Sequence, residues 1–168
     1  VYAHKGLIAS FAGDAFTALF PLRRRDAAHH AAQVALAIQH LFAEHRLVQT
    51  PYGDFALGAG VGLGQGLVEW GILGRAGRFT YFFRGPAVER CTRAEQAAAV
   101  GEVIAAAELW PLWGPDGAAH QAGAAGQLID LSAAPAPHRP RLPSLDRADL
   151  RPFLLDEVID LAVPAEFR

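Results

Sequence analysis

One aspartate, Asp14, lies where its carboxylate could do chemistry. It stands between a glycine and a run of apolar side chains in the stretch IASFAGDAFTALFP, residues 8–21. A charge beside apolar bulk is costly unless it is solvated or bound to a partner. A Gly-Asp pair is a common turn, and a carboxylate at a turn is also a hard oxygen ligand for a cation such as Mg²⁺. Both interpretations of Asp14 stay open at the level of this stretch.

Other residues that often carry chemistry lack the required spacing here. The seven histidines share no metal-ligand spacing with cysteine or carboxylate, so we interpret them as surface residues. Cys91 has no catalytic-thiol pattern around it and is expected to pack, and the arginines at residues 23–25 are expected to form a solvated turn. The glycine cluster GVGLGQG, residues 60–66, is not interpreted as a phosphate loop, because neither a helix start nor the required lysine and hydroxyl accompanies it.

The composition indicates a single globular domain. The chain has 168 residues, of which 52% are hydrophobic and 19% charged, and its one cysteine excludes an internal disulfide and favours a reducing compartment. A net charge of −2 predicts no nucleic-acid partner and no anionic membrane partner, and no apolar stretch is long enough to span a bilayer. Because the chain contains no methionine, we expect it to be a piece of a longer polypeptide.

Hydrophobic periodicity predicts the elements that position Asp14. Two apolar runs, residues 7–11 and 15–20, predict a hairpin of central strands buried on both faces. Asp26 is expected to be the N-cap of an amphipathic helix that ends near Glu44. The stretch FALGAGVGLGQG, residues 55–66, alternates strictly, which predicts a strand whose glycine face another element approaches closely.

The remaining pattern adds strands and a second helix. Pro86 is expected to begin a helix that ends near Ala97. Extended segments are predicted in GLVEWGILG, RFTYFFRG, GEVIAAAELWPLWG (followed by one helical turn) and HQAGAAGQLIDLS. This order favours an α+β fold with a mostly antiparallel sheet and helices packed against it. The predicted domain covers residues 1–132, followed by a proline-rich linker at 133–145 and a short helix and connector at 146–168.

Two blocks of the sequence resemble the class III nucleotidyl cyclases. GLIASFAGDAFTALFP, residues 6–21, resembles the family's K-F-x-G-D-A-x-x-A-x-F hairpin. Residues 60–98 resemble its later block, in which a G-x-x-x-G strand pair leads through G-x-x-x-R-x-x-Y into G-x-x-V-x-x-x-x-R on a helix. The tail, residues 153–168, is similar to the connector after the first domain of tandem proteins like soluble adenylyl cyclase.

The resemblance implies a ferredoxin-like α+β domain that works in pairs, with the active site at the pair's interface. It implies conversion of ATP to 3′,5′-cyclic AMP and pyrophosphate with two Mg²⁺ or Mn²⁺ ions held by two aspartates. Asp14 matches the second metal aspartate. The first would lie on an upstream strand, so the chain alone is expected to be inactive. The partners implied are ATP and a second cyclase domain, in tandem or as a homodimer mate, in the cytoplasm.

The other family positions fall on residues that only partly keep the pattern. Arg93 matches the transition-state arginine, which neutralises charge on the phosphate. The adenine-selecting lysine falls on Ser10, the purine-contacting aspartate on Phe82 and the ribose-positioning asparagine on Glu89. The metal and phosphate positions are therefore kept, and the base-recognition positions are not.

Three functional alternatives follow from this partial match. The chain could be the metal-bearing half of an adenylyl cyclase that relies on its partner for the base. It could instead be a degenerate cyclase-homology domain that binds a nucleotide, or a small anion such as bicarbonate at Arg93, and regulates an attached module. A ferredoxin-like interaction domain with no ligand is the third alternative.

Overall fold

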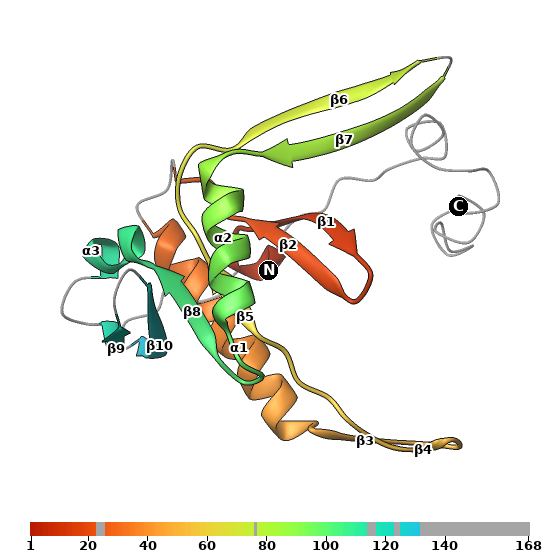
Figure 1. The fold of residues 1–168 in the computed structure, drawn as a ribbon, viewed down its shortest axis with the longest axis vertical. Coiled ribbons are helices and arrows are strands. Elements are labelled where there is room, and N and C mark those ends of the chain that lie inside the picture. The colour runs from red at the N-terminus through yellow and green to blue at the C-terminus, as the bar shows by residue number, and fades with distance from the viewer. Residues whose placement is uncertain (23–25, 76, 114–116, 123–124, 132–168) are drawn as a thin grey trace. The chain divides into compact units, whose positions relative to one another are not determined.

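A computed structural model describes residues 1–22, 26–75, 77–113, 117–122 and 125–131. They form two compact units (Figure 1): unit 1 contains Val1–Val68 and the described residues from Gly85 onward, and unit 2 is Glu69–Arg84. The arginines at 23–25, the predicted linker at 133–145 and the predicted terminal helix at 146–168 lie outside the described residues. The predicted domain boundaries therefore stay predictions.

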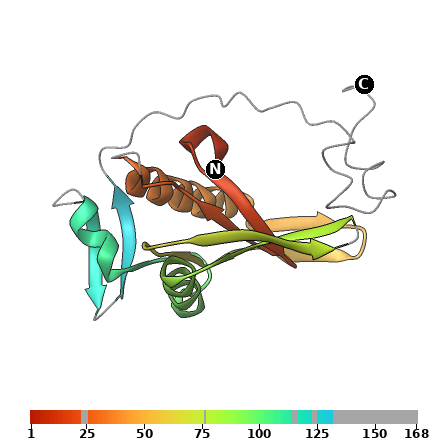
Figure 2. The same cartoon turned by 90° about the horizontal axis from the view of Figure 1, so that it is seen from above.

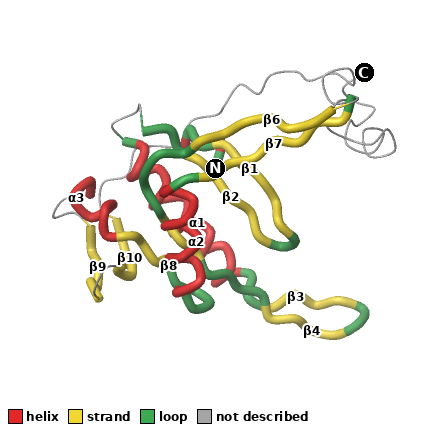
Figure 3. Tube along the Cα trace, turned by 45° about the horizontal axis from the view of Figure 1, so that its top comes forward, coloured by secondary structure: helices red, strands yellow, loops and turns green. Residues whose placement is uncertain are grey.

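Unit 1 contains most of the helices and strands. Its helical elements are η1 (Tyr2–His4), α1 (Ala27–Glu44), α2 (Pro86–Ala97), η2 (Ala107–Leu109) and α3 (Trp110–Trp113). Its strands are β1 (Leu7–Ala12), β2 (Ala15–Leu19), β3 (Leu47–Thr50), β4 (Gly53–Ala56), β5 (Val61–Leu63), β8 (Val103–Ala106), β9 (Gly117–Ala122) and β10 (Ala125–Leu131). Unit 2 is a hairpin of β6 (Glu69–Arg75) and β7 (Arg78–Arg84). The three two-stranded hairpins, β1–β2, β3–β4 and β6–β7, can be followed in Figure 3.

A four-stranded sheet forms the centre of unit 1. Its order is β5-β8-β10-β9, with β5 and β8 parallel and the other pairs antiparallel. The side chains of Val61 and Leu63 on β5 join the core cluster formed with α1, whereas the alternate glycines face α2. The two helices therefore cover opposite faces of β5 (Figures 1 and 2). The predicted α+β fold with a mostly antiparallel sheet is confirmed.

Small side chains bring α1 close to this sheet. The core cluster consists of Ala28, Ala32, Ala35, Val103, Ala105, Leu109 and Trp113. Because alanine has no side chain beyond Cβ, the helix backbone can approach β8 closely. Gln39 on α1 adds a polar clamp: its Nε2 donates to the carbonyls of Ala59 at 2.9 Å and Glu102 at 3.0 Å, just before β5 and β8. The predicted amphipathic helix is confirmed.

The predicted close approach to a glycine face is also confirmed. A Cβ added at Gly62 would overlap the backbone nitrogen of Glu95 and the carbonyl of Cys91, both on α2. A Cβ at Gly64 would lie 2.7 Å from the carbonyl of Ala87. The single strand predicted over residues 55–66 is wrong, because the chain divides there into β4 and β5.

The predicted β1–β2 hairpin is confirmed, but its predicted burial on both faces is wrong. Ala12 pairs with Ala15, which leaves a two-residue turn. Of the residues in these two strands, only Ala9 is buried, and Phe11 is 71% exposed. The reason is that β1 and β2 pair only with each other among the described strands, and no helix covers the Phe11 and Phe16 rings.

Other predicted elements agree with the structure, with two exceptions. Strands β6, β7 and β8 and helix α2 lie where the sequence predicts them, and Pro86 is the first residue of α2. Strand β3 was not predicted. The single final strand predicted in HQAGAAGQLIDLS is wrong, because the described residues of this stretch belong to two antiparallel strands, β9 and β10. Within the described ranges, no helix has both the length and the apolar character that crossing a bilayer requires.

Candidate functional site

The β1–β2 turn presents Asp14 to solvent. Gly13 has a φ of 65° at the first turn position, a left-handed conformation that glycine adopts without steric cost. Asp14 follows at the second position and is exposed. Among the described residues, no hydrogen bond or ion pair holds its carboxylate. Ser10, four positions earlier on β1, is half-buried and pairs with Thr17 on β2.

The Asp14 carboxylate fits the role of one ligand among several for a divalent cation. It is a hard oxygen donor with no competing protein partner, and Mg²⁺ is commonly held by one or two carboxylates together with substrate phosphates. Within the described ranges, no group of three or more histidine, cysteine or acidic side chains could hold a metal ion together. The described residues alone therefore do not make a complete metal site.

Helix α2 carries the second pair of predicted residues. Glu89 and Arg93 are both exposed and are separated by four positions, so they project from the same face of the helix. In the described part of the chain, no ion pair or hydrogen bond engages either side chain. Arg93 is therefore available to an anion, and Glu89 stands beside it as a carboxylate.

Arg90, which was not predicted, fixes this helix to its neighbours. Its Nη1 donates to the carbonyl of Gln65 at 2.8 Å, and its Nε lies 3.0 Å from Oε1 of Glu108. Cys91 Sγ adds a bond to the carbonyl of Gly62 at 3.3 Å, and burial raises the pKa of this thiol. Cys91 therefore packs as predicted. The sequence signal for Arg90 is its position directly before Cys91, on the part of α2 that packs against the glycines.

Phe82 lies in unit 2, on β7. Its ring covers Gly71 on β6, where an added Cβ would lie 2.8 Å from the ring. The guanidinium carbon of Arg84 lies 5.7 Å from the centre of the same ring. A phenyl ring has no hydrogen-bonding group, so Phe82 cannot read a purine edge as an aspartate would.

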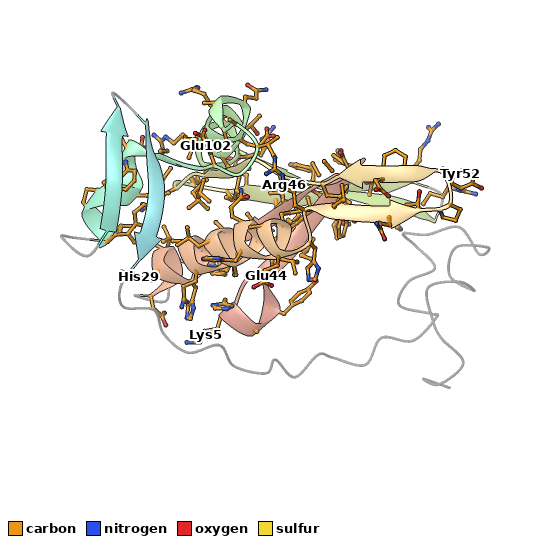
Figure 4. All side chains as sticks on the ribbon, turned by 90° about the horizontal axis from the view of Figure 1, so that it is seen from below. Lys5, His29, Glu44, Arg46, Tyr52 and Glu102 are labelled. Atoms are coloured by element: carbon orange, nitrogen blue, oxygen red, sulfur yellow. The ribbon has the colours of Figure 1, made fainter. Side chains whose placement is uncertain are left out.

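A cluster around one buried histidine, His30, joins η1 to the start of α1, and it corrects the prediction that all histidines lie at the surface. His30 is only 1% exposed, and its Nε2 donates to Oδ2 of Asp26 at 3.0 Å. Lys5, labelled in Figure 4, donates to the same oxygen at 3.2 Å. His4 stands edge-on to the His30 ring, with 5.6 Å between ring centres.

Asp26 uses its carboxylate for this cluster. It is the residue before α1, as predicted, but its side chain caps no backbone N–H group of the helix. The hydrogen bond from Lys5 holds the pKa of Asp26 below its usual value. The cluster thereby fixes the segment that leads into β1, and so the hairpin that carries Asp14.

The structure thus groups the predicted site residues in two pairs. Ser10 and Asp14 share one hairpin, and Glu89 and Arg93 share one helix face. Phe82 belongs to the separately described unit 2.

Comparison with known proteins identifies the fold. No protein-family model matches the chain, and no curated protein matches it. Solved structures do match. The catalytic core of a rhodopsin-guanylyl cyclase with converted specificity, in complex with ATPαS, superposes with a TM-score of 0.61 at 17% identity, covering 77% of this chain and 74% of the other.

Two further structures agree. A guanylyl cyclase superposes with a TM-score of 0.57 at 21% identity, covering 78% of this chain and 73% of the other. The adenylyl cyclase CyaB from P. aeruginosa gives 0.58 at 20% identity, covering 77% and 74%. The chain therefore has the fold of the catalytic domains of class III nucleotidyl cyclases, as its sequence motifs imply.

Proposed function

We propose that this chain is a nucleotidyl cyclase domain, the metal-bearing half of an adenylyl cyclase that works with a partner domain. The observation that carries the proposal is the Asp14 carboxylate, which is exposed and unpaired among the described residues at a hairpin turn of the cyclase fold. The family motif implies a metal aspartate at this position. The partner would be a second cyclase domain, in tandem or as a homodimer mate, and the ATP substrate favours a cytoplasmic location.

The proposed reaction closes a ring on ATP. The ribose 3′-oxygen forms a bond to the α-phosphorus, the bond from that phosphorus to the bridging oxygen breaks, and the 3′-hydroxyl loses its proton. The products are 3′,5′-cyclic AMP and pyrophosphate. Two Mg²⁺ or Mn²⁺ ions, when bound, would help to ionise the 3′-hydroxyl and would neutralise phosphate charge. Asp14 would hold them as a ligand.

Arg93 would act on the phosphate. A guanidinium is permanently charged and offers paired N–H donors to phosphate oxygens. The α2 helix that carries Arg93 is held at fixed distance from β5 by the glycine contacts and by Arg90. This rigidity supports a role in which Arg93 stabilises the charge that develops during the attack.

In a tandem arrangement, the base would be recognised mainly by the partner domain. Ser10, Phe82 and Glu89 replace the lysine, aspartate and asparagine of the family pattern. The Phe82 ring packs over Gly71, and the Arg84 guanidinium lies over the same ring. Specificity for ATP over GTP would therefore not come from these positions.

Asp14→Ala in the full-length protein should reduce Mg²⁺- or Mn²⁺-dependent cyclic AMP formation at least about 100-fold, because a metal ligand is lost. The products, cyclic AMP and cyclic GMP, are measured by mass spectrometry with ATP or GTP as substrate. Thermal unfolding should be unchanged, because the exposed side chain packs against nothing that the structure describes.

The control for this variant is Asp54→Ala. Asp54 is also an exposed aspartate on a two-stranded hairpin, and it faces Gln49 on the neighbouring strand. It should keep full activity. Full activity of Asp14→Ala would remove the metal role, and equal losses in both variants would mean that the effect is not specific to Asp14.

The base positions also support a second candidate, a regulatory cyclase-homology domain. In that case Arg93 would bind a nucleotide phosphate or a small anion such as bicarbonate without turnover. Calorimetry distinguishes the candidates: binding of ATP with Mn²⁺ or of bicarbonate, lost in Arg93→Ala and without product formation, would favour the regulatory domain. Detection of neither ligand would favour an interaction domain that has no ligand.

A further inference from the structure

Small residues make the contact between α2 and β5. The buried side chains of α2 are Ala87 and Ala94. On the strand, a Cβ added at Gly62 or Gly64 would overlap the backbone of α2. Packed helices resist rotation where their side chains form ridges that fit into grooves. Alanine and glycine form no such ridges, so this contact sets the separation of α2 from β5 and resists rotation of α2 about its own axis only weakly.

Arg90 supplies the directional contacts that this face of α2 lacks. Its Nη1 donates to the carbonyl of Gln65 at 2.8 Å, and its Nε lies 3.0 Å from Oε1 of Glu108. Gln65 follows β5, and Glu108 lies in η2, which follows β8. A guanidinium is planar and holds its N–H groups in a fixed fork. Two acceptors on different segments therefore fix the plane of this group as well as its position.

The backbone beside Gln65 leaves room for the guanidinium. The next residue is Gly66, where an added Cβ would lie 2.9 Å from Nη1 of Arg90 and 3.1 Å from the backbone nitrogen of Ala87. A larger residue at this position would have to displace the guanidinium from its carbonyl acceptor. The glycine thus permits the close approach on which the Arg90 contact depends.

The two arginines of α2 are engaged differently. Glu108 balances the charge of Arg90, whereas no ion pair or hydrogen bond engages Arg93 in the described part of the chain. Helical spacing places Arg93 about 60° around the axis from Arg90. A rotation of α2 by about 20° would move a side chain at a radius of about 6 Å through about 2 Å. Misplacement by about 1 Å can cost a reaction about 100-fold in rate.

We propose that Arg90 and Glu108 are positioning residues for Arg93. They fix the rotation of α2 about its axis, and thereby the direction in which the Arg93 guanidinium meets a phosphate. This inference rests on the proposed function, in which Arg93 acts on the phosphate. The side chains of Arg90 and Glu108 are 36% and 46% exposed, and ion pairs this exposed add little to the free energy of unfolding. The pair is therefore suited to orientation more than to stability.

Arg90→Gln tests this role, because it removes the charge and the fork. In the full-length protein, kcat for cyclic nucleotide formation should fall about 10- to 100-fold, while KM for ATP stays within about threefold. The midpoint of thermal unfolding should stay within about 3 °C of the wild type. The matched control is Arg46→Gln, which removes the charge of another exposed arginine and should leave kcat unchanged.

Two variants of Glu108 separate a directional bond from a charge effect. Glu108→Gln keeps a side-chain oxygen that can accept from Nε of Arg90, whereas Glu108→Ala removes the acceptor. We expect Glu108→Gln to keep kcat within about threefold of the wild type and Glu108→Ala to lower it as Arg90→Gln does. Equal losses in both variants would mean that charge balance, and not orientation, is what Glu108 provides.

A second background separates positioning from a general folding defect. A lysine ammonium is a compact charge on a flexible stem, so it depends less than a guanidinium on the direction in which the helix points it. In an Arg93→Lys background, Arg90→Gln should therefore lower kcat by no more than about threefold. A folding defect would lower kcat by the same factor in both backgrounds.

Spin labels measure the rotation of α2 without turnover. The 168-residue chain has one cysteine, and Cys91→Ser keeps a donor for the carbonyl of Gly62. In that variant, Ala37→Cys on the exposed side of α1 and Arg93→Cys on α2 provide the two labelling sites. Pulsed electron paramagnetic resonance gives the distance distribution between the labels. Arg90→Gln should widen this distribution by about 2 Å or more, and Arg46→Gln should not.

Several outcomes would overturn the proposal. These are full kcat in Arg90→Gln, an equal loss in Arg46→Gln, the same loss in the Arg93→Lys background, and an unchanged distance distribution. A widened distribution in a protein that forms no cyclic nucleotide would retain the orientation of α2 by Arg90 and reject the proposed function. An active protein in which Arg90→Gln changes neither kcat nor the distribution would do the reverse.

Discussion

Two aspartates near the start of the chain, Asp14 and Asp26, differ in what surrounds their carboxylates. Asp14 is exposed at a turn and is available to a ligand, whereas one Asp26 oxygen accepts bonds from both Lys5 and His30. The first arrangement suits reversible metal binding, and the second suits a structural role at the start of α1. Residue type alone does not separate these roles, because both positions follow ordinary turn and cap patterns.

The lowered pKa of Asp26 predicts how stability depends on pH. The folded state binds the Asp26 proton more weakly than the unfolded chain does, because in the unfolded chain the carboxyl has its usual pKa of 3.8. The contribution of Asp26 to the free energy of unfolding is therefore present above that value and is lost as pH falls through the lower pKa of the folded state. Asp26→Asn should unfold more easily than the wild type at pH 7, and the difference should shrink toward pH 3.

Urea denaturation at several pH values measures this difference. Asp54→Asn serves as the control, since this exposed aspartate is not part of the cluster. A difference between wild type and Asp26→Asn that stays constant from pH 7 to pH 3 would contradict an electrostatic role for Asp26.

At the scale of elements, the glycines in and beside β5 lead to a prediction about stability. Gly62→Ala should lower the free energy of unfolding by about 1–3 kcal/mol or more, because the new methyl group would overlap the backbone of α2. Gly60→Ala should cost less, since its Cβ would lie 3.0 Å from the carbonyl of Ala98 near the end of the helix. Chemical denaturation measures both. Equal, small effects would mean that α2 moves away from β5 easily.

Element positions follow from local sequence, and burial does not. Both long helices were predicted from the spacing of their apolar residues and from the residues at their starts, Asp26 and Pro86. Helical periodicity and helix-start residues are local properties of the sequence, so they can be recognised without knowing the fold. The alternating glycines in and beside β5 predicted the close approach of another element for the same reason, and that element is α2. The exposure of Phe11 could not be predicted, because it depends on which strands pair.

The same limit applies to the candidate site. Motif spacing placed Asp14 at a turn and placed Glu89 and Arg93 on one helix face. It missed Arg90, whose two partners lie far away in sequence. It also missed the burial of His30, whose ring contacts the His4 ring from η1, a segment distant from it in sequence.

At the scale of the whole molecule, the homodimer form of the proposed function predicts rescue between inactive variants. If each site takes its metal aspartate from one copy and its arginine from the other, then Asp14→Ala and Arg93→Ala should each be inactive alone. Mixed after dissociation, they should recover about one quarter of wild-type activity, because half of the dimers are mixed and each mixed dimer keeps one intact site.

The control for this rescue is each variant dissociated and reassociated alone. Every site then lacks either the metal aspartate or the arginine, so activity should stay absent. A mixture of the original variants that remains inactive, although sedimentation detects mixed dimers, would show that Asp14 and Arg93 do not serve one site from two copies.

The glycine side of β5 has a mechanical consequence. Where backbone touches backbone, no side chain lies between the two elements that could change rotamer to absorb a displacement. A displacement of α2 toward the sheet would therefore have to displace β5 as well, and the Gln39 amide, bonded to the carbonyls of Ala59 and Glu102, links the same strands to α1. A ligand that pulls on Arg93 would therefore act on α2, β5 and α1 together.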